Sequence, residues 1–356
     1  MEIPAVIKFT TQAHKGYPLR KAGLLPVPLT LFIKKTILFK MILTVTTNPL
    51  LERRLLVDEL YPGSEHRAKS ERYTAGGKGI NVSRQLTLLG VDNLAYTFIG
   101  GNNGRIFRSI LTAEQINFTF VQTKNETRSA QLIIDEKSGK VSTFFGLNAQ
   151  ISQKEADEFK SKLRKVIGSC EMVIFSGSSP GVFCDDIIPF GIRTAHENDK
   201  ISVCDTYGAH LKSCIESAPT IIHNNIHETE ASLNISLKNE SEITEYLDYL
   251  YSLGVKQSYL TNGKNPVYCS SFNYIYKAEP PEITELNATG SGDAFTSGIA
   301  CGLHRAFTFE DTLAMASGLG AANALRSDVC CAGEAEYKSL MSGVKISTIG
   351  KKMRNL

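Results

Sequence analysis

The residues with the clearest capacity for chemistry form a glycine-rich turn near the C-terminus, Gly290-Ser291-Gly292-Asp293. We expect the apolar residues that follow it to form a helix. A glycine-rich turn at a helix start leaves backbone N–H groups unpaired at the positive end of the helix dipole, so it can bind an anion. Asp293 would repel that anion unless its task is to take a proton from a nucleophile that attacks the anion. The turn therefore suits phosphoryl transfer to a hydroxyl group, although an ordinary turn with an N-capping Asp is the alternative at this point.

The segments that must position this turn predict an α/β fold. Met41 begins a strand of the buried type, and from residue 153 onwards strand-like and helix-like segments alternate. Strands joined by helical crossovers are parallel, and helices then cover both faces of the sheet. A short strand is also expected at 282–286, just before the glycine-rich turn. The expected strands of the sheet are 41–47, 93–99, 172–176, 201–205, 220–223 and 257–261, and the expected helices from residue 153 onwards are 153–167, 185–198, 208–217, 241–253, 294–305 and 310–326.

Polar turns follow several of the expected strands. In a parallel sheet, ligands bind beyond the carboxyl ends of the strands, and turns rich in Gly, Asn and Asp gather at this rim. Each of them could be ordinary turn chemistry, but so many on one rim favour a binding site. They are Asn48, 176–180, Asp205, 224–225 and 261–263.

The composition is that of a globular protein without a strongly charged partner. The chain has 356 residues, of which 42% are apolar, and a formal net charge of +3. This charge is too small to indicate nucleic acid or a membrane surface as a partner. The eight cysteines include no Cys-x-x-Cys pair, so we expect buried reduced thiols in a cytoplasmic protein, and no zinc site.

The two ends of the chain differ from the middle. Residues 1–40 are basic and contain a single acidic residue, Glu2, while Lys34 and Lys35 interrupt their apolar run, so a membrane span is not expected. This segment could be a targeting extension, or untranslated sequence ahead of a later start at Met41, and we favour the second. We expect one domain over 41–345 and a C-terminal tail over 346–356.

Several short motifs stand in order along the chain. They are 47–52 (Thr-Asn-Pro-Leu-Leu-Glu), 76–82 (Gly-Gly-Lys-Gly-Ile-Asn-Val), 100–104 (Gly-Gly-Asn-Asn-Gly), 126–128 (Glu-Thr-Arg), 176–181 (Ser-Gly-Ser-Ser-Pro-Gly), 205–208 (Asp-Thr-Tyr-Gly), 225–228 (Asn-Ile-His-Glu) and 290–293 (Gly-Ser-Gly-Asp). Together they resemble the ribokinase-like sugar kinases, and most closely the phosphofructokinase-B branch that includes 1-phosphofructokinase and tagatose-6-phosphate kinase. The resemblance covers about 41–345, and ordered motifs at both ends of one domain make it specific.

The resemblance implies a Rossmann-like three-layer α/β sandwich with a mainly parallel sheet and a small β-sheet lid. The lid strands would lie near 53–73 and 129–146, cover the sugar, and pair with the lid of a second subunit, so a homodimer is expected. The implied reaction uses ATP as co-substrate, Mg²⁺ as cofactor and a small phosphorylated sugar as acceptor. A lid suits this chemistry because phosphoryl transfer must exclude competing water.

The resemblance also implies the catalytic roles. Asp293 would be the base for the sugar hydroxyl, and the N–H groups of 290–293 would bind the transferring phosphoryl group. A carboxylate with an ordinary acid pKa would suffice, because the hydroxyl proton is lost late in a loose transition state. Asn225 and Glu228 would position Mg²⁺, mainly through water, since Mg²⁺ keeps much of its hydration in proteins.

Two cations are candidates for a phosphate that the substrate already carries. Lys78 and Arg128 lie in motifs of the resemblance, and kinases of unphosphorylated sugars need no such pair. Small residues on a helix would leave room for the nucleotide, although tight helix packing explains them nearly as well. The residues expected at the sugar hydroxyls are Glu52, Gly76, Gly77 and Asn81, and those expected at ATP are Asn225, Thr261, Gly263, Gly318, Ala321, Ala322 and Asn323.

Some positions depart from the usual motifs of this branch. Glu52 stands where Asp is usual, which lengthens a sugar contact by one methylene, and Ala130 stands where Asn is common. His223-Asn224-Asn225 replaces Lys-Pro-Asn, which removes a cation near the triphosphate, and Thr261-Asn262-Gly263 replaces Ser-Leu-Gly. Because of these differences, the identity of the sugar and the catalytic efficiency stay open. The class of reaction is less affected.

The leading hypothesis is an ATP-dependent kinase that converts fructose 1-phosphate to fructose 1,6-bisphosphate, with tagatose 6-phosphate and fructose 6-phosphate as alternative substrates. A catalytically weak regulator that binds sugar phosphates on the same fold is a second hypothesis. The retention of Asp293, Asn225 and Glu228 disfavours it. A nicotinamide-dependent oxidoreductase is disfavoured as well, because its glycine fingerprint should follow the first strand rather than lie near the C-terminus.

Overall fold

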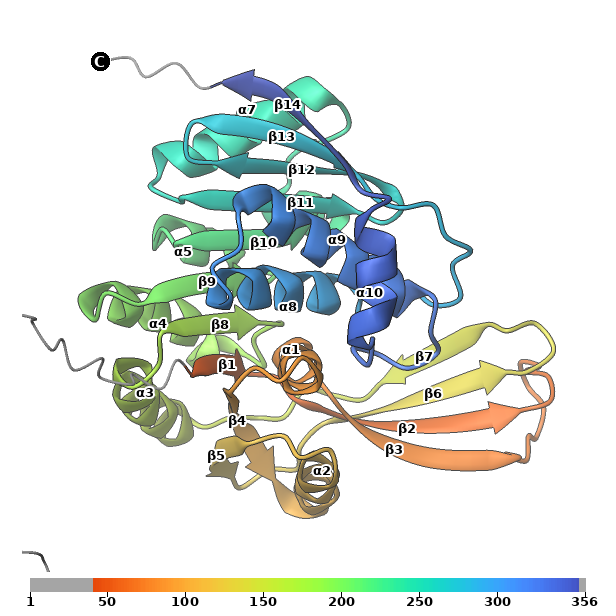
Figure 1. Cartoon of the computed structure of the whole chain (residues 1–356). Helices are drawn as coiled ribbons and strands as arrows, with labels where there is room; N and C mark the ends of the chain where they lie inside the picture. The colour runs from red at the N-terminus through yellow and green to blue at the C-terminus, as the bar shows by residue number, and fades with distance from the viewer. Residues whose placement is uncertain (1–40, 352–356) are drawn as a thin grey trace, which may run out of the picture. The chain divides into compact units, whose positions relative to one another are not determined.

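The computed structural model describes residues 41–351 (Figure 1). The basic segment 1–40 lies outside the described residues, as do 352–356, so the expectations for these residues are not addressed by the structure. No helix in the described part of the chain is both long and apolar enough to cross a membrane. All eight cysteines are free thiols, and all but Cys331 are buried, as expected.

The larger sheet has ten strands in the order β14-β13-β12-β11-β10-β9-β8-β1-β4-β5. The pairs from β5 through β11 are parallel, and β12, β13 and β14 are added antiparallel at one edge. The mainly parallel sheet is therefore confirmed. The strands are β1 (Ile42–Thr46), β4 (Asn93–Gly100), β5 (Phe118–Thr123), β8 (Met172–Ser176), β9 (Ile201–Asp205), β10 (Ile221–Asn225), β11 (Gln257–Asn262), β12 (Asn265–Ser271), β13 (Tyr274–Glu279) and β14 (Lys345–Lys351).

Two expectations near the C-terminus are wrong. Residues 346–351 are not a tail, because they form most of β14 and pair with β13. Only Ile346 and Ile349 of this strand pack against the core, so its sequence has little of a strand's apolar pattern. Residues 282–286 form no strand; they follow two prolines, which lack the N–H that a sheet requires.

Helices cover both faces of the larger sheet, which makes the expected three layers (Figure 1). The helices α3 to α7 pack in one apolar cluster, whereas α1, α8, α9 and α10 pack in another, and α2 covers the end of the sheet at β4 and β5. The helices are α1 (Lys78–Leu88), α2 (Gly101–Ala113), α3 (Gln153–Gly168), α4 (Ile187–Glu197), α5 (Leu211–Glu216), α6 (Ile226–Leu233), α7 (Glu240–Ser252), α8 (Ser291–His304), α9 (Phe309–Ala324) and α10 (Glu334–Met341), with a short 3-10 turn η1 (Val182–Cys184).

A second sheet of four strands, in the order β3-β2-β6-β7, extends beside the larger sheet (Figure 1). Its strands are β2 (Leu50–Val57), β3 (Ser70–Gly76), β6 (Ser129–Asp135) and β7 (Val141–Phe145). They use the segments expected for the lid, although β2 begins at residue 50 and β3 runs on to residue 76. Side chains alternate between the two faces of a strand, so Glu52 and Arg54 share one face of this lid sheet and Arg53 lies on the other.

Candidate functional site

The glycine-rich turn opens helix α8 as the sequence predicts. Gly290 precedes the helix with φ 79°, a conformation that favours glycine, and a Cβ there would overlap Val329. The N–H of Ser291 donates to Ala288 O at 3.1 Å. Within residues 41–351 the N–H groups of Gly292 and Asp293 have no recorded partner. Of the four N–H groups in the turn, that of Ser291 is thus paired within the chain, whereas those of Gly292 and Asp293, in the first turn of the helix, are available to an anion.

Asn323 on α9 holds the turn in place. Its Nδ2 donates to Thr289 O at 2.8 Å and to Ser291 Oγ at 3.1 Å, and its Oδ1 accepts from the N–H of Cys330 at 2.7 Å. Asn323 is fully buried, so the structure gives this expected nucleotide contact a role in supporting the turn. Gly318, expected at the nucleotide as well, faces α10. This agrees with the packing alternative for that residue.

Asp293 is a buried carboxylate at the start of α8, only 4% exposed. Burial raises its pKa to about 7, and the nearby ammonium group of Lys78 limits the rise. Asn81 Nδ2 donates to Asp293 Oδ2 at 2.7 Å, and Arg84 Nη1 fixes the orientation of Asn81 by donating to its Oδ1 at 2.8 Å. The pKa is thus higher than the ordinary value that the sequence suggested, and it lies in the range where a general base works best near neutral pH.

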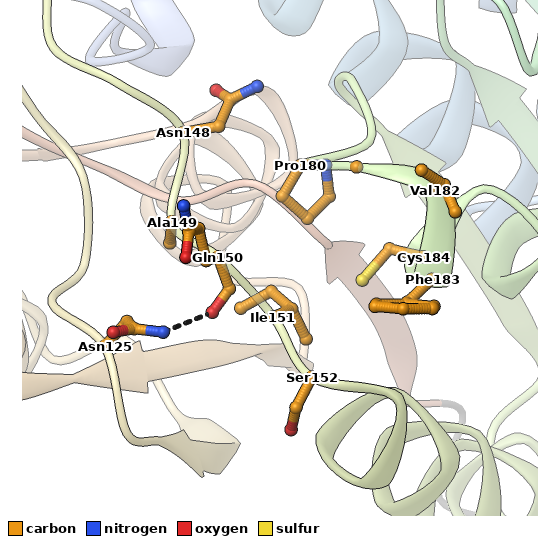
Figure 2. Close-up of a pocket in the computed structure, with 11 residues that line it drawn as sticks. Asn125, Asn148, Ala149, Gln150, Ile151, Ser152, Pro180, Val182, Phe183 and Cys184 are labelled. Carbon is orange, nitrogen blue, oxygen red and sulfur yellow. Dashed lines mark hydrogen bonds between the residues drawn. The ribbon is translucent and has the colours of Figure 1, made fainter.

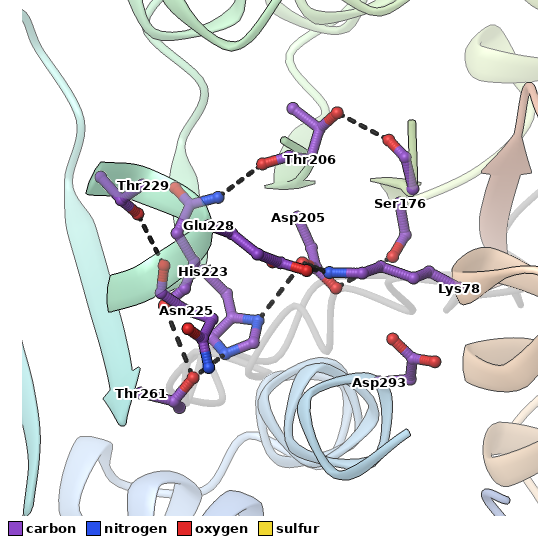
Figure 3. A network of polar contacts seen from close by, with 12 residues as sticks. Lys78, Ser176, Asp205, Thr206, His223, Asn225, Glu228, Thr229, Thr261 and Asp293 are labelled. Carbon is purple, nitrogen blue, oxygen red and sulfur yellow. Dashed lines mark hydrogen bonds and ion pairs between the residues drawn. The ribbon is translucent and has the colours of Figure 1, made fainter. Parts of the chain in front are cut away.

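Lys78, at the first position of α1, reaches into a cluster of acidic side chains (Figure 3). Its Nζ donates to Glu228 Oε2 at 3.0 Å and to Asp205 Oδ1 at 3.3 Å, and it lies 4.8 Å from the ring centre of Tyr207. Burial alone would lower the pKa of Lys78, but the carboxylates of Asp205 and Glu228, with Asp293, raise it above its usual value. Lys78 therefore stays charged beside the candidate base.

Asp205 anchors this cluster from the end of β9. It is fully buried, accepts from Ser176 Oγ at 2.9 Å and lies 3.6 Å from His223 Nδ1. Burial would raise the pKa of Asp205, but Lys78 and His223 hold it below its usual range. The sequence marked Asp205 as part of a polar rim without giving it a partner. The contact with Lys78 joins residues 127 positions apart, which local patterns do not reveal.

His223 lies beneath the same cluster and is 2% exposed. Its Nε2 lies 3.2 Å from Thr261 Oγ1 (Figure 3). Its Nδ1 lies 2.9 Å from Thr296 Oγ1, and its ring stacks on Phe295. The side chain that replaces the usual lysine is therefore a buried support between β10, β11 and α8. Gly263, by contrast, borders open space, with no atom within 4 Å of where its Cβ would be.

Arg128 forms the other cationic part of the site, at the base of the lid. Its Nη2 donates to Asn48 O at 3.1 Å, its Nη1 to Asn148 Oδ1 at 3.3 Å, and its Nε to Pro49 O at 3.4 Å. Burial lowers its pKa, and no carboxylate pairs with it in the described part of the chain. A partly buried guanidinium held only by neutral groups is suited to binding an anion. The structure thus groups Arg128 with asparagines and Lys78 with acids.

Glu126, which precedes Arg128 in the Glu-Thr-Arg motif, forms its hydrogen bonds with the protein backbone. Its two carboxylate oxygens accept from the N–H groups of Asn102 and Asn103 at 2.9 Å each, at the start of α2. The N–H of Gly100 donates to Thr127 Oγ1 at 3.0 Å. The Glu-Thr-Arg motif therefore fastens the chain to α2, which fixes the point where Arg128 enters the site.

The expected sugar contacts meet where β2 and β3 approach α1. A Cβ on Gly76 would lie 2.7 Å from Glu52 Oε1, and Gly77 has φ 115° beside Thr46 at the end of β1. Gly77 needs glycine because of its positive φ, whereas a Cβ at position 76 would displace the Glu52 side chain. Glu52 Oε2 accepts from Arg54, whereas its Oε1 has no recorded hydrogen bond within residues 41–351. One carboxylate oxygen is thus free to accept from a sugar hydroxyl.

The residues proposed for Mg²⁺ do not form a protein cage. Asn225 Oδ1 caps α6 by accepting from the N–H of His227 at 2.8 Å, and Glu228 is paired with Lys78. Within residues 41–351 no group of three His, Cys, Asp or Glu side chains could hold a metal. The side chain of Glu228 is 31% exposed, so it fits an ion that keeps its water and is held mainly by phosphate, as Mg²⁺ usually is.

A pocket of about 410 Å³ opens beside the Arg128 side of the site (Figure 2). Loop 148–152 forms one wall, and residues 180–184 around η1 form the other. Asn148 belongs both to this pocket and to the hydrogen bonds of Arg128. No pattern in the sequence indicated this pocket, because loops from separate parts of the chain build it.

Comparisons with known proteins agree with this arrangement. A family model described as "pfkB family carbohydrate kinase" matches residues 48–332. A tagatose-6-phosphate kinase of Staphylococcus epidermidis is 31% identical over 288 residues, which are 80% of this chain and 92% of that protein. A 1-phosphofructokinase of Borreliella burgdorferi is 28% identical over 82% of this chain and 94% of its own. The crystal structure of a possible 1-phosphofructokinase from Thermotoga maritima shares the fold, with a TM-score of 0.80 and 22% identity over 87% of this chain and 100% of that one.

Proposed function

The chain belongs to the pfkB family of carbohydrate kinases and is a phosphotransferase with an alcohol group as acceptor, and we propose that it transfers a phosphoryl group from ATP to a ketohexose phosphate. The observation that carries this proposal is the turn at α8. It places a buried carboxylate with a pKa of about 7, Asp293, beside two unpartnered N–H groups and the charged Lys78. A base, an anion site and a fixed cation in one place are the parts that phosphoryl transfer to a hydroxyl requires.

In the proposed mechanism the sugar hydroxyl approaches Asp293, which accepts its proton as the oxygen attacks the γ-phosphorus of ATP, while the bond from this phosphorus to the β,γ-bridging oxygen breaks and ADP leaves. The N–H groups of Gly292 and Asp293 stabilise the charge on the transferring phosphoryl group, and so does the ammonium group of Lys78. The sequence suggested Lys78 for the phosphate that the substrate already carries, but we propose it for the transferring group because it pairs with Asp205 and Glu228 near Asp293. Mg²⁺, when bound with ATP, would supply further positive charge at the phosphates, and Glu228 is the carboxylate that would face it. Asn81 keeps Asp293 in one orientation throughout, because its amide is itself fixed by Arg84.

The proposed substrate already carries a phosphate. Arg128 supports this, because it is partly buried and its partners are neutral, so a phosphate would supply the missing counter-charge. We place fructose 1-phosphate first, with fructose 1,6-bisphosphate as product, and tagatose 6-phosphate and fructose 6-phosphate as alternatives. The names of the two sequence relatives, a tagatose-6-phosphate kinase and a 1-phosphofructokinase, support this group of substrates.

The lid supports the proposal of a homodimer. Strand β7 is an edge of the lid sheet, and Val141, Phe144 and Phe145 on it are 46%, 60% and 67% exposed. An edge strand with several exposed apolar side chains is a surface on which another strand can pair. We propose that a second copy of the chain covers it.

The experiment that tests the function is a coupled assay of ADP release with each of the three ketohexose phosphates and with free fructose. The proposal expects turnover of at least one phosphate ester and little or none of free fructose. Binding of a ketohexose phosphate with no turnover would instead indicate a regulator, and equal turnover of free fructose would contradict the role of Arg128.

A further inference from the structure

The lid face that carries Glu52 also carries a buried arginine, Arg54. The two residues stand two positions apart on β2, so their side chains lie on the same face. Arg54 is only 6% exposed, and its Nε and Nη2 donate to Glu52 Oε2 at 3.2 and 3.1 Å. Arginine is seldom buried unless its charge is paired. The ion pair with Arg54 therefore helps to fix the position of Glu52, the proposed sugar contact.

The same guanidinium group reaches from the lid to the body of the protein. Its Nη1 donates to Ser327 O at 3.3 Å and lies 3.5 Å from Asp328 Oδ1, in the loop between α9 and α10. Arg72 stands opposite Arg54 on β3 and forms a two-pronged ion pair with the Asp328 carboxylate. This pair of hydrogen bonds holds the pKa of Asp328 below its usual value. One loop of the body thus binds two neighbouring strands of the lid.

The loop also contacts the catalytic turn. Ser327 O accepts a second hydrogen bond, from Asn287 Nδ2 at 3.3 Å, and Asn287 Oδ1 accepts from the N–H of Thr289 at 3.0 Å. Thr289 immediately precedes Gly290, the residue that opens the anion-binding turn. A continuous series of hydrogen bonds therefore runs from Glu52 through Arg54 and Ser327 to the turn that holds Asp293.

We propose that Arg54, with Asp328, is a positioning residue that orients the Glu52 carboxylate toward the sugar and fastens the lid to the catalytic body. The orientation of Glu52 follows from its hydrogen bonds. Because Arg54 donates to Oε2, the other oxygen, Oε1, faces the Gly76 backbone and the site. The sugar in this inference rests on the proposed function. The attachment of the lid does not, since it consists of contacts within the chain.

The expected effect is largest on the sugar phosphate. Without the guanidinium group, the mostly buried Glu52 carboxylate loses two charge-assisted hydrogen bonds and can turn away from the site. We expect Arg54→Met to lower kcat/KM for the sugar phosphate by roughly 10–100-fold, because misplacing one substrate contact affects both binding and alignment. The KM for ATP should change by less than about threefold, since Arg54 contacts none of the residues proposed for the nucleotide.

The neighbouring residue provides a matched control. Arg53 is on the same strand, points to the opposite face and pairs with Glu71 in solvent, where the two side chains are 41% and 38% exposed. Arg53→Met removes the same charge from β2 without touching Glu52 or the loop. An exposed pair of this kind contributes little to stability, so this variant should keep the wild-type kinetics.

The test compares the two variants in steady-state kinetics and in hydrogen exchange of the lid. Arg54→Met should lower sugar kcat/KM and speed amide exchange in β2 and β3, and Arg53→Met should do neither. In a Glu52→Gln background, Arg54→Met should lower kcat/KM for the sugar phosphate little further, because Glu52, the residue through which Arg54 acts, is already changed. If Arg54→Met does not fold, Asp328→Asn, a change at a half-exposed residue, replaces it, and faster lid exchange is again expected.

Three results would overturn the inference: equal effects of Arg53→Met and Arg54→Met, an equal rise in the KM of ATP and of the sugar phosphate, or unchanged exchange in the lid. A wild-type protein that turns over none of the ketohexose phosphates would instead contradict the proposed function and, with it, the role toward the sugar. The exchange comparison would then still decide whether Arg54 attaches the lid.

Discussion

Replacing Asp293 by Asn should inactivate the enzyme and, at the same time, stabilise it. As a base, Asp293 takes the proton from the sugar hydroxyl, and loss of a general base commonly lowers the rate by about 10²–10⁴-fold. Asn keeps the shape and can still accept from Asn81, so binding of ATP and of the sugar phosphate should persist. The activity of the wild type should fall as the pH drops below about 7, because the carboxylate then becomes protonated.

The effect on stability follows from the raised pKa. In the unfolded chain an aspartate titrates near pH 4, whereas burial raises the pKa of folded Asp293 to about 7. Between these values the folded protein keeps a proton that the unfolded chain has released, so this group's contribution to stability is fully present below pH 4 and is lost as the pH rises toward 7. Above pH 7 the ionised carboxylate costs on the order of 2–4 kcal/mol, and Asn removes this cost.

The assay measures kcat and the melting temperature of the wild type and Asp293→Asn at pH 5.5 and pH 8. Asp92→Asn, a change on an exposed residue, is the control. The melting temperature of Asp293→Asn should exceed that of the wild type by several degrees at pH 8 and by clearly less at pH 5.5. A near-normal kcat would refute the role of Asp293 as base, and a melting temperature at pH 8 no higher than that of the wild type would refute the raised pKa.

Further predictions concern the two cations, the metal and the lid. Arg128→Ala should raise the KM for the sugar phosphate by roughly 10–100-fold and leave the KM for ATP almost unchanged; an equal rise in both would exclude Arg128 as a ligand of the substrate's phosphate. Lys78→Met should lower kcat by at least about 100-fold, measured under saturating substrates, and a fall in binding alone would show that Lys78 acts before the chemical step. Glu228→Gln should increase the Mg²⁺ concentration needed for half-maximal activity, whereas an unchanged Mg²⁺ titration would remove Glu228 from the metal site. Changing Phe144 and Phe145 to Ser should shift the mass in solution from dimer to monomer, and light scattering that gives one mass for both proteins would contradict a lid interface.

The sequence was most informative where the chemistry is local. The turn before α8 carries its geometry in adjacent residues, so its place at a helix start could be predicted. The strands in the centre of the larger sheet were also predictable, because they are short, apolar and buried on both faces. The strands β12, β13 and β14 were not expected, since their sequences mix polar with apolar residues and resemble loops.

Contacts between distant segments could not be predicted in the same way. The pairing of Lys78 with Asp205 and the position of Arg54 against Ser327 depend on how the sheet and lid are assembled. The raised pKa of Asp293 was missed for a related reason, because burial is a property of the packed structure. Asn323, which the resemblance suggested for the nucleotide, forms three hydrogen bonds that support the turn, and these contacts between distant segments could not be predicted either.

The most direct test of the proposed reaction is to follow fructose 1-phosphate, ATP and Mg²⁺ by phosphorus NMR with the purified protein. The account predicts that ADP and a new sugar phosphate ester appear in equal amounts, that the original ester is retained, and that Asp293→Asn produces neither at a comparable rate. If the same measurement with tagatose 6-phosphate and fructose 6-phosphate also yields no new ester, or if ATP is split only to inorganic phosphate, the assignment as a ketohexose phosphate kinase is contradicted.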